Sequence, residues 1–128
     1  MAADKGGNVI TWFEIPATDF SRAVGFYDAL FGISLKREAM GADQMAMFPA
    51  DPATAVSGCV MFGAHYKPSA DGAVIYLNAH DEIDALLARV PSLGGRVLLG
   101  KTALPPGLGF FAHILDTEGN RVGLHGVK

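Results

Sequence analysis

Two ionisable side chains stand out because the sequence places them in or beside apolar segments. Glu14 lies within residues 8–15, a run rich in β-branched and aromatic residues, and His125 follows the expected strand 121–124. Burying a carboxylate is costly unless the group is paired, and burial raises its pKa toward the range useful for a general base. Glu14 and His125 are therefore tentative catalytic residues, which would exchange a proton if the fold brings them together.

Each of these residues also has a structural interpretation. The Glu14 carboxylate can accept hydrogen bonds from backbone N–H groups or a hydroxyl, or lie at the wet edge of a cavity. His125 is close to the end of the chain and can simply be solvated. Both interpretations stay open from the sequence.

The remaining histidines and the single cysteine do not form a recognisable metal-binding pattern. No pair among His65, His80 and His113 has HxH or HxxxH spacing, so an unconventional histidine-based metal site is only a minor alternative. Cys59 lies in an apolar segment and is expected to be a small buried hydrophobic residue. A single thiol cannot form an internal disulfide.

The composition predicts a small cytoplasmic protein. The chain has 128 residues, of which 50% are hydrophobic and 18% charged, with a net charge of −3. Because its Lys and Arg residues are scattered, we expect neither a nucleic-acid partner nor an anionic membrane partner. Residues 1–7 lack the apolar core of a signal peptide, and no apolar run approaches the roughly 18 residues that cross a bilayer.

Hydrophobic periodicity predicts two similar modules, each with the element order βαβββ. The first has strands at 8–15, 33–38, 44–48 and 56–63, with a helix capped by Thr18 or Asp19 and ended by Gly32. The second has strands at 73–78, 96–99, 110–115 and 121–124, with a helix from about residue 81 to Gly94.

The repeat has a spacing of 63 residues, since Leu30-Phe31-Gly32 matches Leu93-Gly94-Gly95. It predicts a single α+β domain at 8–126, with module one at 8–63, a linker at 64–72 and module two at 73–126. Each module alone is too small to be stable. Together the two can form a curved mixed sheet around a cup, a concave surface typical of ligand sites.

Two segments carry a family resemblance that covers about residues 8–126. The run from Trp12 to Tyr27, WFEIPATDFSRAVGFY, and the run from Asp116 to His125, DTEGNRVGLH, resemble the opening and closing segments of vicinal-oxygen-chelate proteins. This superfamily includes glyoxalases, bleomycin resistance proteins and extradiol dioxygenases. The chain is most similar to its uncharacterised glyoxalase-like subgroup, which is related to lactoylglutathione lyase.

The resemblance implies four metal-ligand positions, which carry over to Trp12, Val60, Ile75 and Gly123. None of these side chains offers a lone pair to a divalent metal. We therefore expect no metal and no cofactor, and neither glyoxalase I nor extradiol dioxygenase chemistry.

Strand alternation from the carried-over positions gives the expected lining of the cup. The lining is mostly aromatic and apolar, with one carboxylate and one imidazole, and its expected ligand-binding residues are Trp12, Glu14, Phe62, Leu77 and His125. This composition favours a small amphipathic or aromatic organic ligand bound in a metal-free cup.

Three readings of the function stay open. The first is ligand binding without chemistry. The second is a lyase or isomerase that uses Glu14 and His125 or a non-standard divalent metal site, and the third is an accessory domain that docks another protein. Because drug-binding relatives form their sites between two protomers, the resemblance also implies a homodimer.

Overall fold

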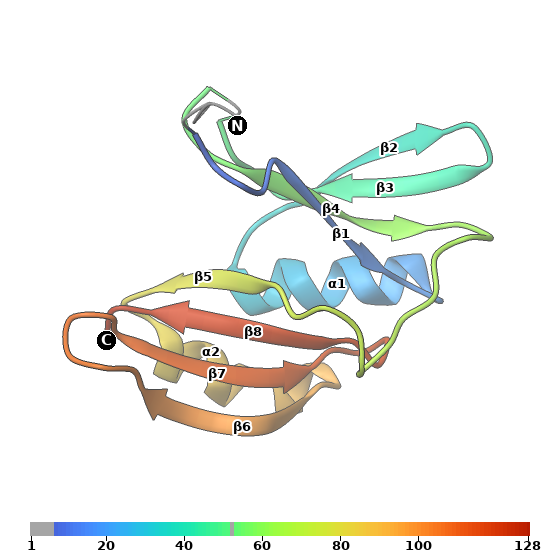
Figure 1. Ribbon diagram of the computed structural model, residues 1–128. Helices are drawn as coiled ribbons and strands as arrows, with labels where there is room; N and C mark the ends of the chain where they lie inside the picture. Colours follow the sequence, from blue (N-terminus) through green and yellow to red (C-terminus); the bar gives the residue numbers. More distant parts are fainter. Residues whose placement is uncertain (1–6, 52) are drawn as a thin grey trace.

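The computed structural model describes residues 7–51 and 53–128, and it confirms the α+β class with two βαβββ modules (Figure 1). The first module contains β1 (Trp12–Pro16), α1 (Phe20–Phe31), β2 (Lys36–Met40), β3 (Asp43–Met47) and β4 (Ser57–Phe62). The second contains β5 (Tyr76–His80), α2 (Ile83–Arg89), the 3₁₀ helix η1 (Pro91–Leu93), β6 (Arg96–Ala103), β7 (Phe110–Leu115) and β8 (Arg121–Gly126).

The strands hydrogen-bond as two four-stranded sheets of the same topology. Their orders are β1-β4-β3-β2 and β5-β8-β7-β6. The first and last strands of each module pair in parallel, and the other pairs are antiparallel. Each sheet is therefore mixed. The edge strands are β1 and β2 in the first sheet, and β5 and β6 in the second.

Helix α1 begins and ends where the sequence predicts. Asp19, one of the two expected caps, accepts a hydrogen bond from the Arg22 N–H, which satisfies a free donor of the first turn. Gly32 ends the helix in the left-handed conformation at φ 64°, which a residue without Cβ adopts without strain. The apolar face packs in the core through Ala23, Val24, Phe26, Tyr27 and Leu30.

The second helix is shorter than the periodicity predicts. It ends at Arg89, and the chain continues through the 3₁₀ turn Pro91–Leu93 to Gly94, which has φ 92°. Proline lacks an N–H and its ring clashes with the preceding turn, so Pro91 cannot extend the α-helix. None of the helices in the described part of the chain is long and apolar enough to cross a membrane.

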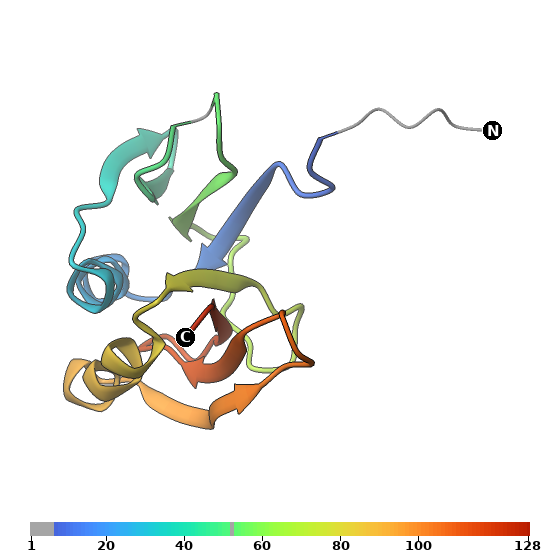
Figure 2. The same cartoon turned by 90° about the vertical axis from the view of Figure 1, so that its left-hand side faces the viewer.

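Each sheet has one helix-facing side and one open side. Helix α1 lies between the two sheets, on the side of the first sheet that faces the second module (Figure 1). Helices α1 and α2 contact each other along one flank of the molecule (Figure 2). The open side of the first sheet is therefore turned away from the second module.

Two glycines show which residues share each side. A Cβ on Gly58 would overlap the ring of Phe13, so both residues lie on the helix-facing side of the first sheet. A Cβ on Gly123 would overlap the ring of Tyr76, and these two residues lie on the open side of the second sheet. Because strand side chains alternate, Trp12 belongs to the open side of its sheet.

A turn at residues 116–120 in the second module binds the first module through buried polar groups. The Tyr27 hydroxyl of α1 donates to Asp116 Oδ2 at 2.6 Å, and Asn120 Nδ2 donates to the Pro16 carbonyl at 2.8 Å. Asp116 also accepts the backbone N–H groups of Glu118 and Asn120, both at 2.9 Å. The turn thus fixes β1 and α1 of the first module against the second.

Glu118 completes this contact at the start of α1. Its carboxylate accepts the backbone N–H groups of Thr18 and Asp19 at 2.9 and 2.7 Å, and Arg22 Nε at 2.7 Å. The side chain of Glu118 is 0% exposed. Burial alone raises the pKa of Glu118, but hydrogen bonds from Arg22, Asp19, Thr117 and Thr18 outweigh it and lower the pKa to about 2.

We expect Glu118 to make stability depend on pH in the acid range. A carboxyl whose pKa falls from 4.5 to about 2 on folding stabilises the protein above pH 4.5, and this is lost as pH falls toward 2. The loss should be roughly 2–3 kcal/mol in the free energy of unfolding, measured by urea titration at several pH values. Glu118→Gln should lack this dependence.

The exposed Glu38→Gln variant is the matched control, and it should keep the wild-type pH profile. Equal acid sensitivity of wild type and Glu118→Gln would contradict the role of this carboxylate.

Candidate functional site

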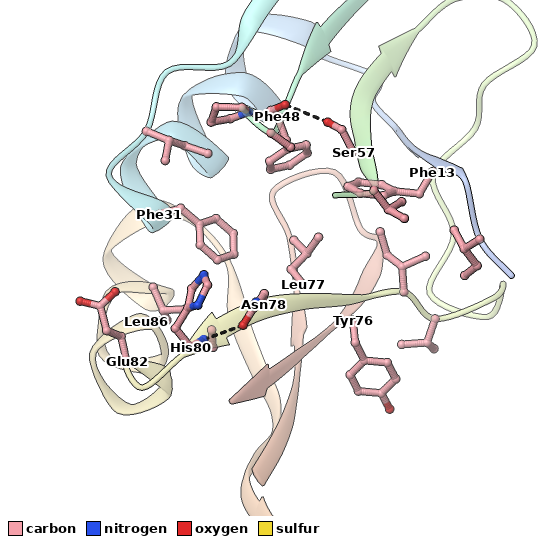
Figure 3. A pocket seen from close by; sticks show the side chains of 18 residues that line it. Phe13, Phe31, Phe48, Ser57, Tyr76, Leu77, Asn78, His80, Glu82 and Leu86 are labelled. Carbon is pink, nitrogen blue, oxygen red and sulfur yellow. Dashed lines mark hydrogen bonds between the residues drawn. The ribbon is translucent and has the colours of Figure 1, made fainter. Parts of the chain in front are cut away.

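An apolar cleft of about 620 Å³ lies between the two modules. Phe13, Phe48 and Ser57 of the first module lie above it, and Leu77, His80 and Leu86 of the second lie below (Figure 3). Its apolar walls are formed by Ile10, Phe13, Phe31, Ile33, Phe48, Val56, Val74, Ile75, Leu77 and Leu86.

Aromatic contacts hold the wall from the first module in place. The ring centroids of Phe13 and Phe48 are 5.5 Å apart, and those of Phe48 and the fully buried Tyr27 are 5.7 Å apart. Such tilted and edge-on pairs are favourable geometries for aromatic rings. Because Tyr27 is itself held by Asp116, the position of the wall depends on the contact between modules.

A few polar groups reach this apolar space. Ser57 Oγ donates to the Phe48 carbonyl at 2.8 Å, which leaves the hydroxyl oxygen able to accept (Figure 3). Asn78 Oδ1 accepts the His80 N–H at 2.8 Å, so the Asn78 amide N–H₂ remains a donor. Within residues 7–51 and 53–128, the His80 ring forms no hydrogen bond and lies beside Phe31 and Leu86 (Figure 3).

His80 has an unusual backbone for a residue with a side chain. Its φ is 51°, in the left-handed region that most residues avoid. The conformation is held by the hydrogen bond that the His80 N–H donates to Asn78 Oδ1, and by the Val127 N–H, which donates to the His80 carbonyl at 2.7 Å. This geometry turns the chain from β5 toward α2 and directs the imidazole to the cleft.

The residues expected to line one cup are divided among different surfaces. Leu77 lines the cleft and is 8% exposed, on the helix-facing side of β5. Phe62 alternates with Met61 and shares the helix-facing side of β4 with Val60. Trp12 and Glu14 lie on the open side of the first sheet, and His125 lies on the open side of the second.

Glu14 and His125 are therefore not brought together within one chain. In the described part of the chain, no hydrogen bond or ion pair joins them, because α1 separates the open side of the first sheet from the second module. Glu14 is exposed and raises the pKa of Tyr66, chiefly through its charge. His125 Nε2 donates to the Leu108 carbonyl at 2.8 Å.

The positions carried over from metal-dependent relatives do not fit a divalent metal. Val60 is 0% exposed in the core, and Gly123 lies beneath the Tyr76 ring. Cys59 is on the open side beside Glu14, but burial and then the Glu14 charge raise its pKa to about 12, so the thiol keeps its proton. Across residues 7–51 and 53–128, no three His, Cys, Asp or Glu residues form a group suited to a metal.

Sequence reasoning missed the three phenylalanines of the cleft, Phe13, Phe31 and Phe48. The signal was present, because Phe13 alternates with Trp12 and Phe31 lies on the apolar face of the expected helix. These two patterns place Phe13 and Phe31 on the helix-facing side of the first sheet, whereas the sequence analysis placed the cup on the side of Trp12. His80 was expected at a helix start, and nothing in the sequence marked its ring as part of a cavity.

Comparison with known proteins gives one family and one relative of similar length. The model of the Glyoxalase/Bleomycin resistance protein/Dioxygenase superfamily matches residues 9–124. A Glyoxylase-like domain-containing protein of Didymella fabae is 34% identical over 114 residues, which cover 87% of this chain and 88% of that protein.

Solved structures show the same fold at low sequence identity. Hypothetical protein SA1046 from S. aureus has a TM-score of 0.70 and 20% identity, over 95% of this chain and 96% of that one. TnmS3, an antibiotic binding protein from Streptomyces sp. CB03234, has a TM-score of 0.64 and 19% identity, over 96% and 98% of the two chains. These similarities concern the fold alone.

We expect Cys59 to be almost unreactive in the folded protein. Its thiol is 0% exposed and has a pKa of about 12, so both access and thiolate content are low. At pH 8 the reaction with a disulfide reagent such as DTNB should be at least about 100-fold slower than that of a free cysteine. Unfolding in guanidinium should restore the fast rate, and a fast rate in the native protein would contradict this environment.

Proposed function

Because the chain belongs to the Glyoxalase/Bleomycin resistance protein/Dioxygenase superfamily, we propose that it binds a small amphipathic or aromatic organic molecule without a metal ion. The observation that carries this proposal is the apolar cleft of about 620 Å³ between the modules. The fold similarity to TnmS3, an antibiotic binding protein, supports it as an analogy.

The size and lining of the cleft define the class of ligand. Its volume falls within the range of about 300–1,000 Å³ typical of small-molecule sites. Phe13, Phe31 and Phe48 offer ring surfaces for an aromatic or alicyclic body. The Asn78 amide and the His80 imidazole lie on one wall, so a ligand with one polar end can pair with them while its body stays apolar.

Binding without chemistry is favoured over the lyase or isomerase alternative. One form of that alternative needs Glu14 and His125 at one reacting centre, and within one chain they lie on the open sides of different sheets. The other form needs a non-standard divalent metal site, and no three His, Cys, Asp or Glu residues of the described ranges 7–51 and 53–128 lie together in a suitable group. Neither residue lines the cleft, and among its described lining residues Glu82 alone has a carboxylate.

Blocking the cleft should weaken the binding of an aromatic probe. We expect the fluorescent probe 8-anilinonaphthalene-1-sulfonate to bind saturably to the native protein. Ala50 is exposed and lies at the cleft, so Ala50→Trp should fill the entrance without disturbing the core and weaken binding at least about tenfold. Fluorescence titration measures this change.

Ala55→Trp is the matched control, because Ala55 is exposed in the same loop and lies outside the cleft lining. It should bind the probe like wild type. If the probe does not bind, or if both variants weaken binding equally, the cleft is not the ligand site.

We also propose that the protein forms a homodimer through the open sides of its sheets. Large apolar side chains are exposed there, with Trp12 at 40% and Tyr76 at 50%. Apolar surface of this kind gains free energy when a second copy covers it.

The molar mass in solution tests this arrangement. Light scattering coupled to size-exclusion chromatography should give about twice the 13.4 kDa of one chain. Trp12→Lys should shift the protein toward the monomer, whereas Val9→Lys, at a fully exposed residue before β1, should not. A wild-type mass of one chain would overturn the proposal.

A further inference from the structure

The edge of β5 that faces away from β8 lies along the apolar cleft. Residues 74–80 line the cleft without a gap, although successive side chains of a strand point to opposite sides. The ring of Tyr76 points away from the cleft, so this residue lines it through its backbone (Figure 3). Because β5 ends its sheet, β8 is its only partner among the described strands. The backbone on its other edge is therefore open to a ligand in the cleft.

The register of β5 on β8 determines which backbone groups face the cleft. The Gly123 N–H donates to the Ile75 carbonyl at 2.8 Å. Tyr76 pairs with Gly123, and Asn78 pairs with the residue two positions further along β8. In a parallel ladder of this register, residues that bond the neighbouring strand alternate with residues whose N–H and C=O point to the other edge. Tyr76 and Asn78 are of the second kind.

Two of these backbone groups lie on either side of Leu77, namely the Tyr76 C=O and the Asn78 N–H. In the part of the chain that the structure describes, neither of them bonds another group. The hydrogen bonds nearby join other atoms, since the His80 N–H donates to Asn78 Oδ1 and the Val127 N–H donates to the His80 carbonyl. The edge of β5 thus offers one acceptor and one donor that point the same way, which is the arrangement that binds an added strand.

This pair of groups matches one residue of a strand added in parallel to β5. The N–H of that residue would donate to the Tyr76 C=O, and its C=O would accept the Asn78 N–H, which places it opposite Leu77. Cross-strand partners share one side of a sheet. The side chain of the bound residue would therefore lie on the side of Leu77, toward Phe31 and Phe48 (Figure 3). An aromatic side chain at this place packs against both rings.

The charges at the cleft favour a ligand whose ends are capped. Among the described lining residues there is no Lys or Arg, while Glu82 has a carboxylate. A ligand carboxylate beside β5 would find no permanent cation there to offset its loss of water. A carboxamide keeps the C=O acceptor and has no charge.

We infer that the cleft binds an N-acylated aromatic amino-acid amide, whose backbone pairs with the Tyr76 C=O and the Asn78 N–H and whose ring packs against Phe31 and Phe48. The inference names a ligand class for the cleft and rests on the proposed function, because it needs the same cavity to take up an organic molecule. The edge of β5 selects the ligand by its amide groups, in addition to the selection of an apolar ring by the cleft walls.

The first test compares two probes that differ at one position. N-acetyl-L-phenylalaninamide should bind saturably, as followed by NMR shifts of the protein. Its ester analogue, (S)-2-acetoxy-3-phenylpropanamide, has an oxygen in place of the N–H that donates to Tyr76, and it should bind at least about fivefold more weakly. Equal affinity of the two probes, or no saturable binding of the amide, would overturn the inference.

The second test locates the contact on β5 through the exchange of backbone amide protons with water, measured by NMR. With the amide probe at about ten times its dissociation constant, exchange of the Asn78 N–H should slow about tenfold, because the bound fraction is protected. The Leu77 N–H faces β8 and is the internal control, whose exchange should not change. An Asn78 N–H that exchanges at its free rate in the saturated protein would show that the ligand does not pair with β5.

A pair of variants tests the same donor from the side of the protein. Asn78→Pro removes the N–H, and proline is tolerated on an edge strand where this group points away from the ladder. Asn78→Ala is the matched control, because both variants lose the side-chain bond to His80 and only proline loses the N–H. Asn78→Pro should bind N-acetyl-L-phenylalaninamide at least about fivefold more weakly than Asn78→Ala.

Equal affinity of the two variants, both shown by a thermal melt to be folded, would contradict the pairing. The comparison of the two probes and the amide exchange use the unaltered protein, so they decide the question if Asn78→Pro does not fold.

The anilinonaphthalene probe separates this inference from the proposed function. Ala50→Trp should weaken the binding of N-acetyl-L-phenylalaninamide as well, because both probes use the same cleft. If Ala50→Trp weakens binding of the anilinonaphthalene probe while the amide and the ester bind equally, the pairing with β5 is overturned and the cleft remains a ligand site. If neither probe binds saturably, the proposed function fails together with the inference.

Discussion

The buried carboxylates of the 116–120 turn are the constraint on which the relative position of the modules depends. A carboxylate removed from water must be surrounded by donors. Those of Glu118 come largely from the first module, and Asp116 accepts the Tyr27 hydroxyl of the first module beside donors of its own turn. In the described part of the chain, no buried side-chain nitrogen or oxygen lacks a partner. Since each unmet acceptor would cost about 1–3 kcal/mol, few other arrangements of the modules satisfy this turn.

The cleft is a direct consequence of that arrangement. Tyr27 is fully buried, bonds Asp116 and packs against Phe48, so the same side chain joins the polar contact to the aromatic wall. With α1 between the sheets, residues of β1 and β5 line the apolar cleft, and in the described part of the chain these two edge strands do not pair with each other. The contacts that fix the two modules together thus keep the cleft open at the edge of their interface, where a ligand would contact both modules.

The open sides of the two sheets differ in chemistry although their topology is the same. The first has Glu14, whose charge raises the pKa of the Tyr66 phenol. Burial, followed by the Glu14 charge, raises the pKa of the Cys59 thiol on the same side. The second has a chain of nitrogen and oxygen groups from Arg121 to Tyr76, made possible by the missing side chain of Gly123. On neither side do three His, Cys, Asp or Glu residues of the described part of the chain group together as metal ligands. The open sides of the two sheets therefore share a topology but differ in their side chains, and so in the groups they offer to a ligand.

Local patterns determined the elements of this protein, and tertiary packing decided which of them form a site. The α1 boundaries at Asp19 and Gly32, the order βαβββ and the family segments depend on neighbours in sequence, and were predicted from it. The shared cup of Trp12, Glu14, Phe62, Leu77 and His125 depended on how two sheets face each other. A strand has two sides, and its alternation does not say which one its partner module will cover. The contact of Asp116 and Glu118 with the start and the face of α1 determines which side is covered. It joins residues about 90–100 positions apart, so no local sequence pattern predicts it.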